Sequence, residues 1–182
     1  WGLSRRHILS QVEASLTRLG TEHLDMYLTH ETPDPATPLE ETLSALNDLV
    51  HQGKVRYLGM SNVPAWQVTK ALWIADRRNY VRVEWVQNSY SLLDRADERE
   101  MFPLCADQGL GYTPFSPLAG GWLSGKYRAG ESFPAGSRMT MRPEPYEQLL
   151  NERTFAGLER LRAHAAERGT DMASLALAWV MS

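Results

Sequence analysis

Three apolar segments of the sequence end in polar side chains that could bind or activate a small polar ligand. His30 ends the first segment, Ser61 and Asn62 end the second, and Gln87 stands near the end of the third. A histidine in such a place can donate a proton, donate a hydrogen bond to a carbonyl, or bind a metal. A hydroxyl and two amides can together hold a flat carboxamide by paired hydrogen bonds. The three segments are residues 24–30, 55–62 and 81–88.

The same residues also have purely structural interpretations. His30 could be a structural histidine at a strand end, and Ser61 or Asn62 could cap a helix that begins at Pro64. We expect no metal site, because no second histidine or cysteine lies at ligand spacing from His30. The remaining histidines lie in predicted helices or turns beside charged residues, and they are His7, His23, His51 and His164.

A second group of candidate residues follows the fourth apolar segment. Phe115 could stack on an aromatic ring, although an ordinary core position is the default for a lone phenylalanine. The glycine-rich stretch from Ser116 to Gly125 could wrap a pyrophosphate with its backbone N–H groups, or it could be a plain loop. Lys126 and Arg138 could contact phosphates, although a lone surface cation is usually only solvated.

Alternating strands and helices would position both groups. Short apolar runs predict strands at 24–30, 55–60, 81–88 and 110–113, and alternation places Val83, Trp85 and Gln87 on one face of the third. Helical spacing between the strands predicts a parallel sheet with helical crossovers. Ligands of such sheets bind beyond the carboxyl ends of the strands, where His30 and Gln87 stand. Polar strand ends on every repeat favour a barrel, although a doubly wound sheet stays possible.

Capping residues predict where the first two helices begin and end. Ser4 caps the first and Gly20 ends it, whereas Thr37 caps the second, with Pro38 at its first position, and Gly53 ends it. Later helices are predicted from Pro64, over 96–108, over 154–168 and from Asp171. Prolines and polar residues predict loops over 31–38 and 128–145.

Composition restricts the classes of function. The chain has 182 residues, a net charge of −3 and one cysteine, Cys105. We expect one domain over residues 1–182, in a reducing, cytoplasmic compartment. The absence of a basic cluster argues against nucleic acid, and the longest apolar run is too short to span a membrane. The oligomeric state is not predicted.

Four stretches in order along the chain resemble the aldo/keto reductase family. SLTRLGTEHLDMYLTHETPD is similar to the family's segment through its fourth barrel strand, and PLEETLSALNDLVHQGKVRYLGMSN to the following helix and strand. VEWVQNSYSLLDR and PFSPLAGGWLSGKY resemble the sixth and seventh strand regions. The resemblance implies an α/β fold, here part of a (β/α)8 TIM barrel, that binds NADP(H) and transfers hydride between nicotinamide and a carbonyl.

The resemblance also implies roles for individual residues. His30 matches the catalytic histidine that orients the substrate carbonyl, and Ser61, Asn62 and Gln87 match residues that hold the nicotinamide carboxamide. Phe115 stands where the family usually stacks a tyrosine or tryptophan on the nicotinamide. The loop over the pyrophosphate matches Ser116, Pro117, Leu118, Ala119, Gly120 and Lys126, and Arg138 matches a cation near the adenosine.

The family's catalytic Asp, Tyr and Lys would lie upstream of Trp1, and its adenosine-binding segment beyond Ser182. We therefore expect a fragment without useful turnover by itself, poorly soluble or associating, from a parent that reduces aldehydes or ketones. A non-catalytic accessory subunit is the alternative, although the presence of His30 favours an enzyme. A Schiff-base aldolase or isomerase is a weaker alternative, because it requires a lysine near a strand end. Lys126 is in such a place, whereas Lys54 precedes a strand and Lys70 lies on a predicted helix.

Overall fold

The structure, a computed structural model, describes residues 2–30 and 34–182. It contains two compact units. The first comprises Trp1–Asn88 and Asp97–Thr113, and the second comprises Ser89–Ala96 and Pro114–Ser182. Whether the chain forms the single domain expected from its sequence stays a prediction.

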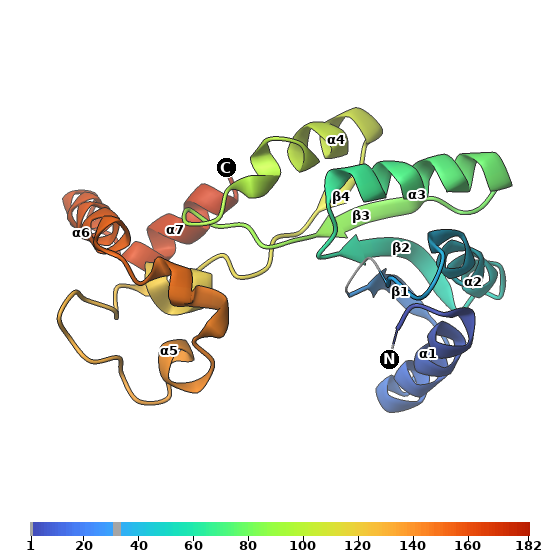
Figure 1. Cartoon of the computed structure of the whole chain (residues 1–182), viewed down its shortest axis with the longest axis horizontal. Helices are drawn as coiled ribbons and strands as arrows, with labels where there is room; N and C mark the ends of the chain where they lie inside the picture. Colours follow the sequence, from blue (N-terminus) through green and yellow to red (C-terminus); the bar gives the residue numbers. More distant parts are fainter. Residues whose placement is uncertain (1, 31–33) are drawn as a thin grey trace. The chain divides into compact units, whose positions relative to one another are not determined.

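The first unit is a parallel four-stranded sheet with helical crossovers, in the order β1-β2-β3-β4. The α/β class predicted from the sequence is therefore confirmed, and it is consistent with part of a (β/α)8 barrel. Figure 1 shows α2 between β1 and β2, and α3 between β2 and β3, along the chain. The strands are β1 (Leu24–Thr29), β2 (Val55–Ser61), β3 (Val83–Gln87) and β4 (Gly111–Tyr112); the helices are α1 (Arg5–Leu19), α2 (Leu39–His51), α3 (Ala65–Arg78), a 3-10 turn (Ala96–Glu98) and α4 (Met101–Gln108).

Helix α1 begins and ends at the predicted residues. The Ser4 side chain accepts a hydrogen bond from the His7 N–H, and Gly20 adopts the left-handed conformation that terminates the helix. Its buried stripe, Ile8, Val12 and Leu16, packs with residues of α2, β1 and β2. A second cluster joins α2, α3 and α4 to β2 and β3. Apolar spacing in the sequence was therefore sufficient to place these helices on the sheet.

The start of α2 differs from the prediction. Pro38 is its N-cap, and no side chain caps the helix, so the prediction of Thr37 as the cap is wrong. The Thr37 hydroxyl instead donates to Asp34 Oδ2 at 2.8 Å, and Asp34 also accepts from the Leu3 N–H. The Thr37 hydroxyl is therefore bonded to Asp34 and does not cap the helix. The predicted loop over 31–38 lies partly outside the described residues, which omit 31–33.

The strand register explains one charged residue and corrects one predicted face. Asp25 lies within β1, where its carboxylate accepts a hydrogen bond from Arg56 on β2 at 2.7 Å. The register between β2 and β3 shifts by one residue at Leu58/Gly59. Val83 consequently joins the buried cluster that contains Val86, although strict alternation predicted opposite faces.

The second unit is mainly helical. Its core is formed by residues of the glycine-rich segment and the last helices, including Trp122, Leu158 and Ala176. The prediction of a loop over 128–145 is wrong in part, because two short helices without a clear apolar period interrupt it. The elements are two 3-10 helices, η2 (Ala119–Ser124) and η3 (Glu144–Leu149), and the α-helices α5 (Arg138–Met141), α6 (Glu152–Glu167) and α7 (Met172–Val180). No helix in the described ranges is both long enough and apolar enough to cross a membrane.

Candidate functional site

The ends of β1, β2 and β3 bring four predicted site residues together in the first unit. Ser61 pairs with Gln87 in the parallel register of β2 and β3. The Asn62 N–H donates to the Gln87 carbonyl at 3.1 Å, and Asn62 Nδ2 donates to the His30 carbonyl at 2.7 Å. Backbone and side chain of Asn62 thus join all three strand ends. The grouping expected from the sequence is present, while the chemical roles stay predictions.

Asn62 occupies an unusual backbone conformation at this position. Its φ is 52°, in the left-handed region that asparagine tolerates better than most residues. Its Nδ2 also contacts Ser61 Oγ at 3.3 Å. Neither residue caps α3, whose N-cap is Pro64, so the capping interpretation is wrong. The Asn62 Nδ2 group already donates to His30 and Ser61, so the groups left for a ligand here are the Ser61 O–H as a donor and Asn62 Oδ1 as an acceptor.

The four residues differ in exposure. Ser61 is buried, Gln87 is half-buried, and His30 and Asn62 are exposed. Gln87 Nε2 makes a long hydrogen bond, 3.4 Å, to the Thr113 hydroxyl after β4. Replacing such a weak hydrogen bond by one to a ligand costs little free energy. The arrangement can thus offer amide and imidazole groups to a small polar molecule.

A buried network that sequence reasoning missed fixes this geometry. Asn88 is buried, accepts the Val63 N–H at Oδ1 (3.0 Å), and donates through Nδ2 to the Val63 carbonyl (2.9 Å). Because Asn88 follows Gln87 and Val63 follows Asn62, this pairing holds the two strand ends in register. The only sequence signal was an amide next to Gln87.

The network continues to an acidic side chain. Asp97 Oδ2 accepts from Asn88 Nδ2 at 2.9 Å and from the Tyr112 hydroxyl at 2.8 Å. Burial, and secondarily the charge of Asp97, raises the pKa of the Cys105 thiol. Since the thiol is buried and protonated, Cys105 is not suited to act as a nucleophile. Its place is in the core between α4 and the sheet.

A cavity of about 490 Å³ lies beside β1 in the first unit. Residues of α1, including His7 and Ile8, form one wall, and Tyr27 and Thr29 of β1 form another, with His30 at one end. Burial raises the pKa of the Tyr27 hydroxyl. Because β1 is the first strand in the sheet order, one of its edges pairs with no strand in the part of the chain that the structure describes.

The second group of predicted residues lies in the second unit. Phe115 is half-buried, forms an isolated parallel bridge with Ser89, and accepts the Tyr90 N–H at its carbonyl. Ser116 and Ala119 both have positive φ, 54° and 47°, in a turn closed by the hydrogen bond from the Ala119 N–H to the Ser116 carbonyl. Pro117 and Leu118 occupy the turn between them. Such conformations are rare for residues other than glycine and are enriched where a loop binds a ligand.

Side chains of other residues pack directly against two glycines of this loop, Gly120 and Gly121. A Cβ atom at Gly120 would lie 2.5 Å from the ring of Tyr146, and a Cβ atom at Gly121 would collide with the Lys126 side chain. Lys126 is exposed, and its Nζ lies 5.3 Å from the centre of the Tyr127 ring. Arg138 is exposed at the start of α5, whose Met139 packs into the core with Trp122. Both cations are accessible to an anion.

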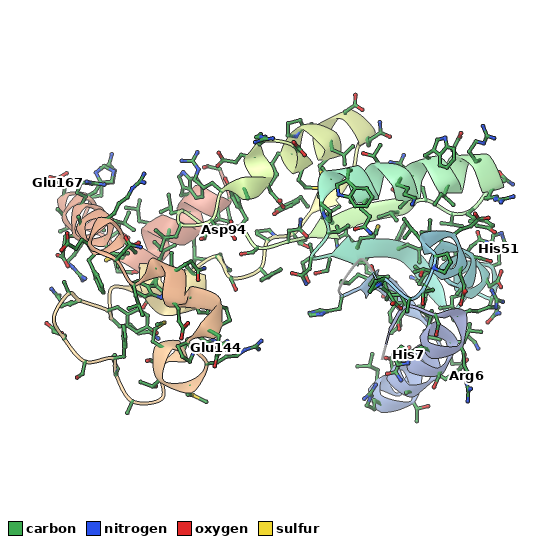
Figure 2. The ribbon with its side chains drawn as sticks, in the orientation of Figure 1. Arg6, His7, His51, Asp94, Glu144 and Glu167 are labelled. Atoms are coloured by element: carbon green, nitrogen blue, oxygen red, sulfur yellow. The ribbon has the colours of Figure 1, made fainter. Side chains whose placement is uncertain are left out.

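The other histidines stand apart from one another in the described part of the chain. Figure 2 shows His7 on α1 and His51 at the end of α2. Across residues 2–30 and 34–182, no three His, Cys, Asp or Glu side chains gather as a metal ion would require.

Comparison with known proteins assigns the family. The model of the aldo/keto reductase family matches residues 1–182, so the chain belongs to this family. It is 38% identical over 185 residues to versiconal hemiacetal acetate reductase of Aspergillus parasiticus, covering 100% of the chain and 52% of that protein.

Two further relatives show how the family varies. A probable voltage-gated potassium channel subunit beta of Oryza sativa subsp. japonica is 39% identical over 186 residues, covering 100% of the chain and 56% of that protein. The uncharacterized oxidoreductase YrpG of Bacillus subtilis is 38% identical over 181 residues, with 100% and 53% covered. The chain spans about half the length of these curated relatives.

Each of the two groups, taken by itself within its own unit, has polar groups of a kind that can bind part of a nucleotide cofactor. Ser61, Asn62 and Gln87 present a hydroxyl and two amides, the donors and acceptors that a carboxamide requires. In the glycine-rich loop the Tyr146 ring lies against Gly120 and the Lys126 side chain lies against Gly121, where a Cβ would otherwise stand. A cation on a loop of left-handed residues is suited to bind phosphate.

Proposed function

We propose that this chain provides the histidine and much of the cofactor site of an NADP(H)-dependent reductase that converts aldehydes or ketones to alcohols. The observation that carries the proposal is the convergence of His30, Ser61, Asn62 and Gln87 at neighbouring strand ends. Membership of the aldo/keto reductase family supports it. The single cysteine, which is buried and free, supports a cytoplasmic location.

The residues would divide the cofactor between them. Ser61, Asn62 and Gln87 would bind the carboxamide, and Phe115 would stack on the nicotinamide ring. Phe115 has no polar group on its ring, so it would contribute only stacking. The pyrophosphate would be covered by the glycine-rich loop, through Ser116, Pro117, Leu118, Ala119, Gly120 and Lys126. Arg138 would bind near the adenosine.

The reaction would join a hydride and a proton to the substrate. The cofactor, when bound, would supply the hydride for the carbonyl carbon and would leave oxidised, and the carbonyl oxygen would take up a proton. His30 would donate a hydrogen bond to that oxygen and stabilise its developing negative charge. The family resemblance implies a tyrosine as the donor of that proton.

Replacing His30 tests the proposal in the protein expressed from its complete gene. His30→Leu, which has no hydrogen-bond donor, should lower kcat for NADPH-dependent aldehyde reduction by about 100-fold, as does loss of one charge-stabilising donor. The affinity for NADPH should stay within about twofold, because His30 is not assigned to cofactor binding. His51→Leu, at an exposed helix end, is the matched control and should leave both quantities unchanged. An unchanged kcat in His30→Leu would refute the role of His30.

A second candidate is a cofactor-binding accessory subunit without turnover. It is favoured by one observation, the 39% identity to a plant protein named as a probable channel subunit beta. Both candidates expect NADPH to bind, whereas only the reductase expects steady oxidation of NADPH by aldehydes. Binding without turnover in the wild-type protein would favour the accessory subunit.

A further inference from the structure

Strained backbone and close contacts occur together in the loop from Ser116 to Gly125. Ser116, Ala119, Gly120 and Gly121 all have φ between 47° and 98°. A non-glycine residue keeps such a conformation only where surrounding groups hold it. The residues that hold this loop should therefore be identifiable from its contacts.

Two tyrosines hold the loop at Gly120. The Tyr127 hydroxyl donates to the Gly120 carbonyl at 3.2 Å, and the Tyr146 ring covers the Gly120 Cα so closely that an added Cβ would lie 2.5 Å from it. The Tyr146 hydroxyl is also 3.3 Å from Ser116 Oγ, within hydrogen-bond distance. Tyr146 therefore contacts both the first residue of the loop and its glycine turn. It lies on η3, the segment that begins at Glu144 (Figure 2).

Tyr127 connects the same turn to the loop cation. It is 1% exposed, and its ring lies 5.3 Å from Lys126 Nζ and packs edge-on against Trp122. The Lys126 side chain in turn covers Gly121. One buried ring thus contacts the glycine turn through its hydroxyl and the lysine ammonium through its face. The shape of the loop and the place of the cation depend on the same residue.

We propose that Tyr146 and Tyr127 are positioning residues that hold Ser116, Gly120 and Lys126 in the shape that binds the cofactor pyrophosphate. This inference rests on the proposed function. A loop held in its binding conformation before the ligand arrives avoids the ordering cost of closing around it. Tyr146 acts from η3, outside the glycine-rich stretch, and Tyr127 acts from its end.

Equilibrium binding of NADPH, followed by quenching of tryptophan fluorescence, tests the inference. Tyr146→Phe keeps the ring and removes the hydroxyl, so the Kd should rise about fivefold, the effect of one neutral hydrogen bond. Tyr146→Ala removes both contacts and should raise the Kd by about tenfold or more. The kcat at saturating NADPH should change by less than about twofold, because the tyrosines do not contact the reacting atoms. Tyr80→Phe, at the end of α3, is the matched control and should not change the Kd.

A double-mutant cycle separates positioning from general damage. Gly120→Ala should raise the Kd strongly when Tyr146 is present, because the new methyl group meets its ring. In the Tyr146→Ala background the same substitution should raise the Kd less, leaving only the penalty of a positive φ. Additive effects of the two substitutions would overturn the proposed contact.

The outcomes also distinguish this inference from the function on which it rests. If wild-type protein binds NADPH and reduces aldehydes while Tyr146→Phe has an unchanged Kd, the positioning role is overturned and the function stands. If wild-type protein does not bind NADPH, the proposed function is overturned together with the ligand assigned to the loop. Raised Kd values with unchanged urea unfolding midpoints support the inference.

Discussion

Replacing Asn88 by leucine should destabilise the protein by about 3 kcal/mol. The side chain is 7% exposed and makes three hydrogen bonds, two to the Val63 backbone and one to Asp97. Each is worth about 1 kcal/mol, and a buried group left without its partner costs at least as much. Leucine has the same number of side-chain heavy atoms and the same branching but is bulkier, so the substitution removes the hydrogen bonds without leaving a cavity. The loss should appear as a lower urea midpoint with an unchanged slope.

The matched control is Asn47→Leu on α2. Its Oδ1 accepts one hydrogen bond, from the Val81 N–H at 2.9 Å, so the cost should be about 1 kcal/mol. Hydrogen exchange gives a local measurement, because the Val63 amide should lose protection only in the Asn88 variant. Equal costs for the two variants, or a protected Val63 amide in Asn88→Leu, would refute the assignment of Asn88 as the residue that joins the strand ends.

Three further predictions test other contacts. Hydrogen bonds, first from the Leu3 N–H, lower the pKa of the Asp34 carboxyl in the folded protein. The stability that Asp34 contributes is therefore present above the unfolded-state pKa and is lost as the pH falls through the lower folded-state pKa. In Asp34→Asn, the melting temperature should consequently depend less on pH in the acid range. Cys105, buried with a raised pKa, should react with a thiol reagent at least about 100-fold faster in urea than in buffer. A Cβ at Gly59 would lie 2.6 Å from the Trp85 ring, so Gly59→Ala should lower the unfolding free energy by about 1–3 kcal/mol and shift the tryptophan emission; an unchanged spectrum would contradict this.

Regular elements with clear end signals were predictable from the sequence. Ser4 and Gly20 fix the ends of α1, and Asp171 caps α7 through the Ser174 N–H, because these signals act within a few residues. Thr37 failed as a predicted cap because Asp34, three residues earlier, takes its hydroxyl. Local capping rules do not anticipate a competing acceptor.

Sequence patterns predicted some contacts between distant segments and missed others. The strand-end residues His30, Ser61 and Gln87 were predictable because parallel strands end at the same edge. Tyr146 was not, because it reaches Ser116 from 30 residues away after an irregular segment without an apolar period. The reversed face of Val83 was also missed, since a register shift leaves no mark in an alternating pattern.

The most direct test of the account compares two ligands on one variant. Gln87→Leu removes an amide assigned to the nicotinamide carboxamide, so calorimetry should show NADPH binding weakened by about tenfold. Binding of 2′-phospho-ADP-ribose, which lacks the nicotinamide, should stay within about twofold of wild type. This selective loss would support the strand ends as the nicotinamide site. Equal loss for both ligands, or no loss for NADPH, would contradict it.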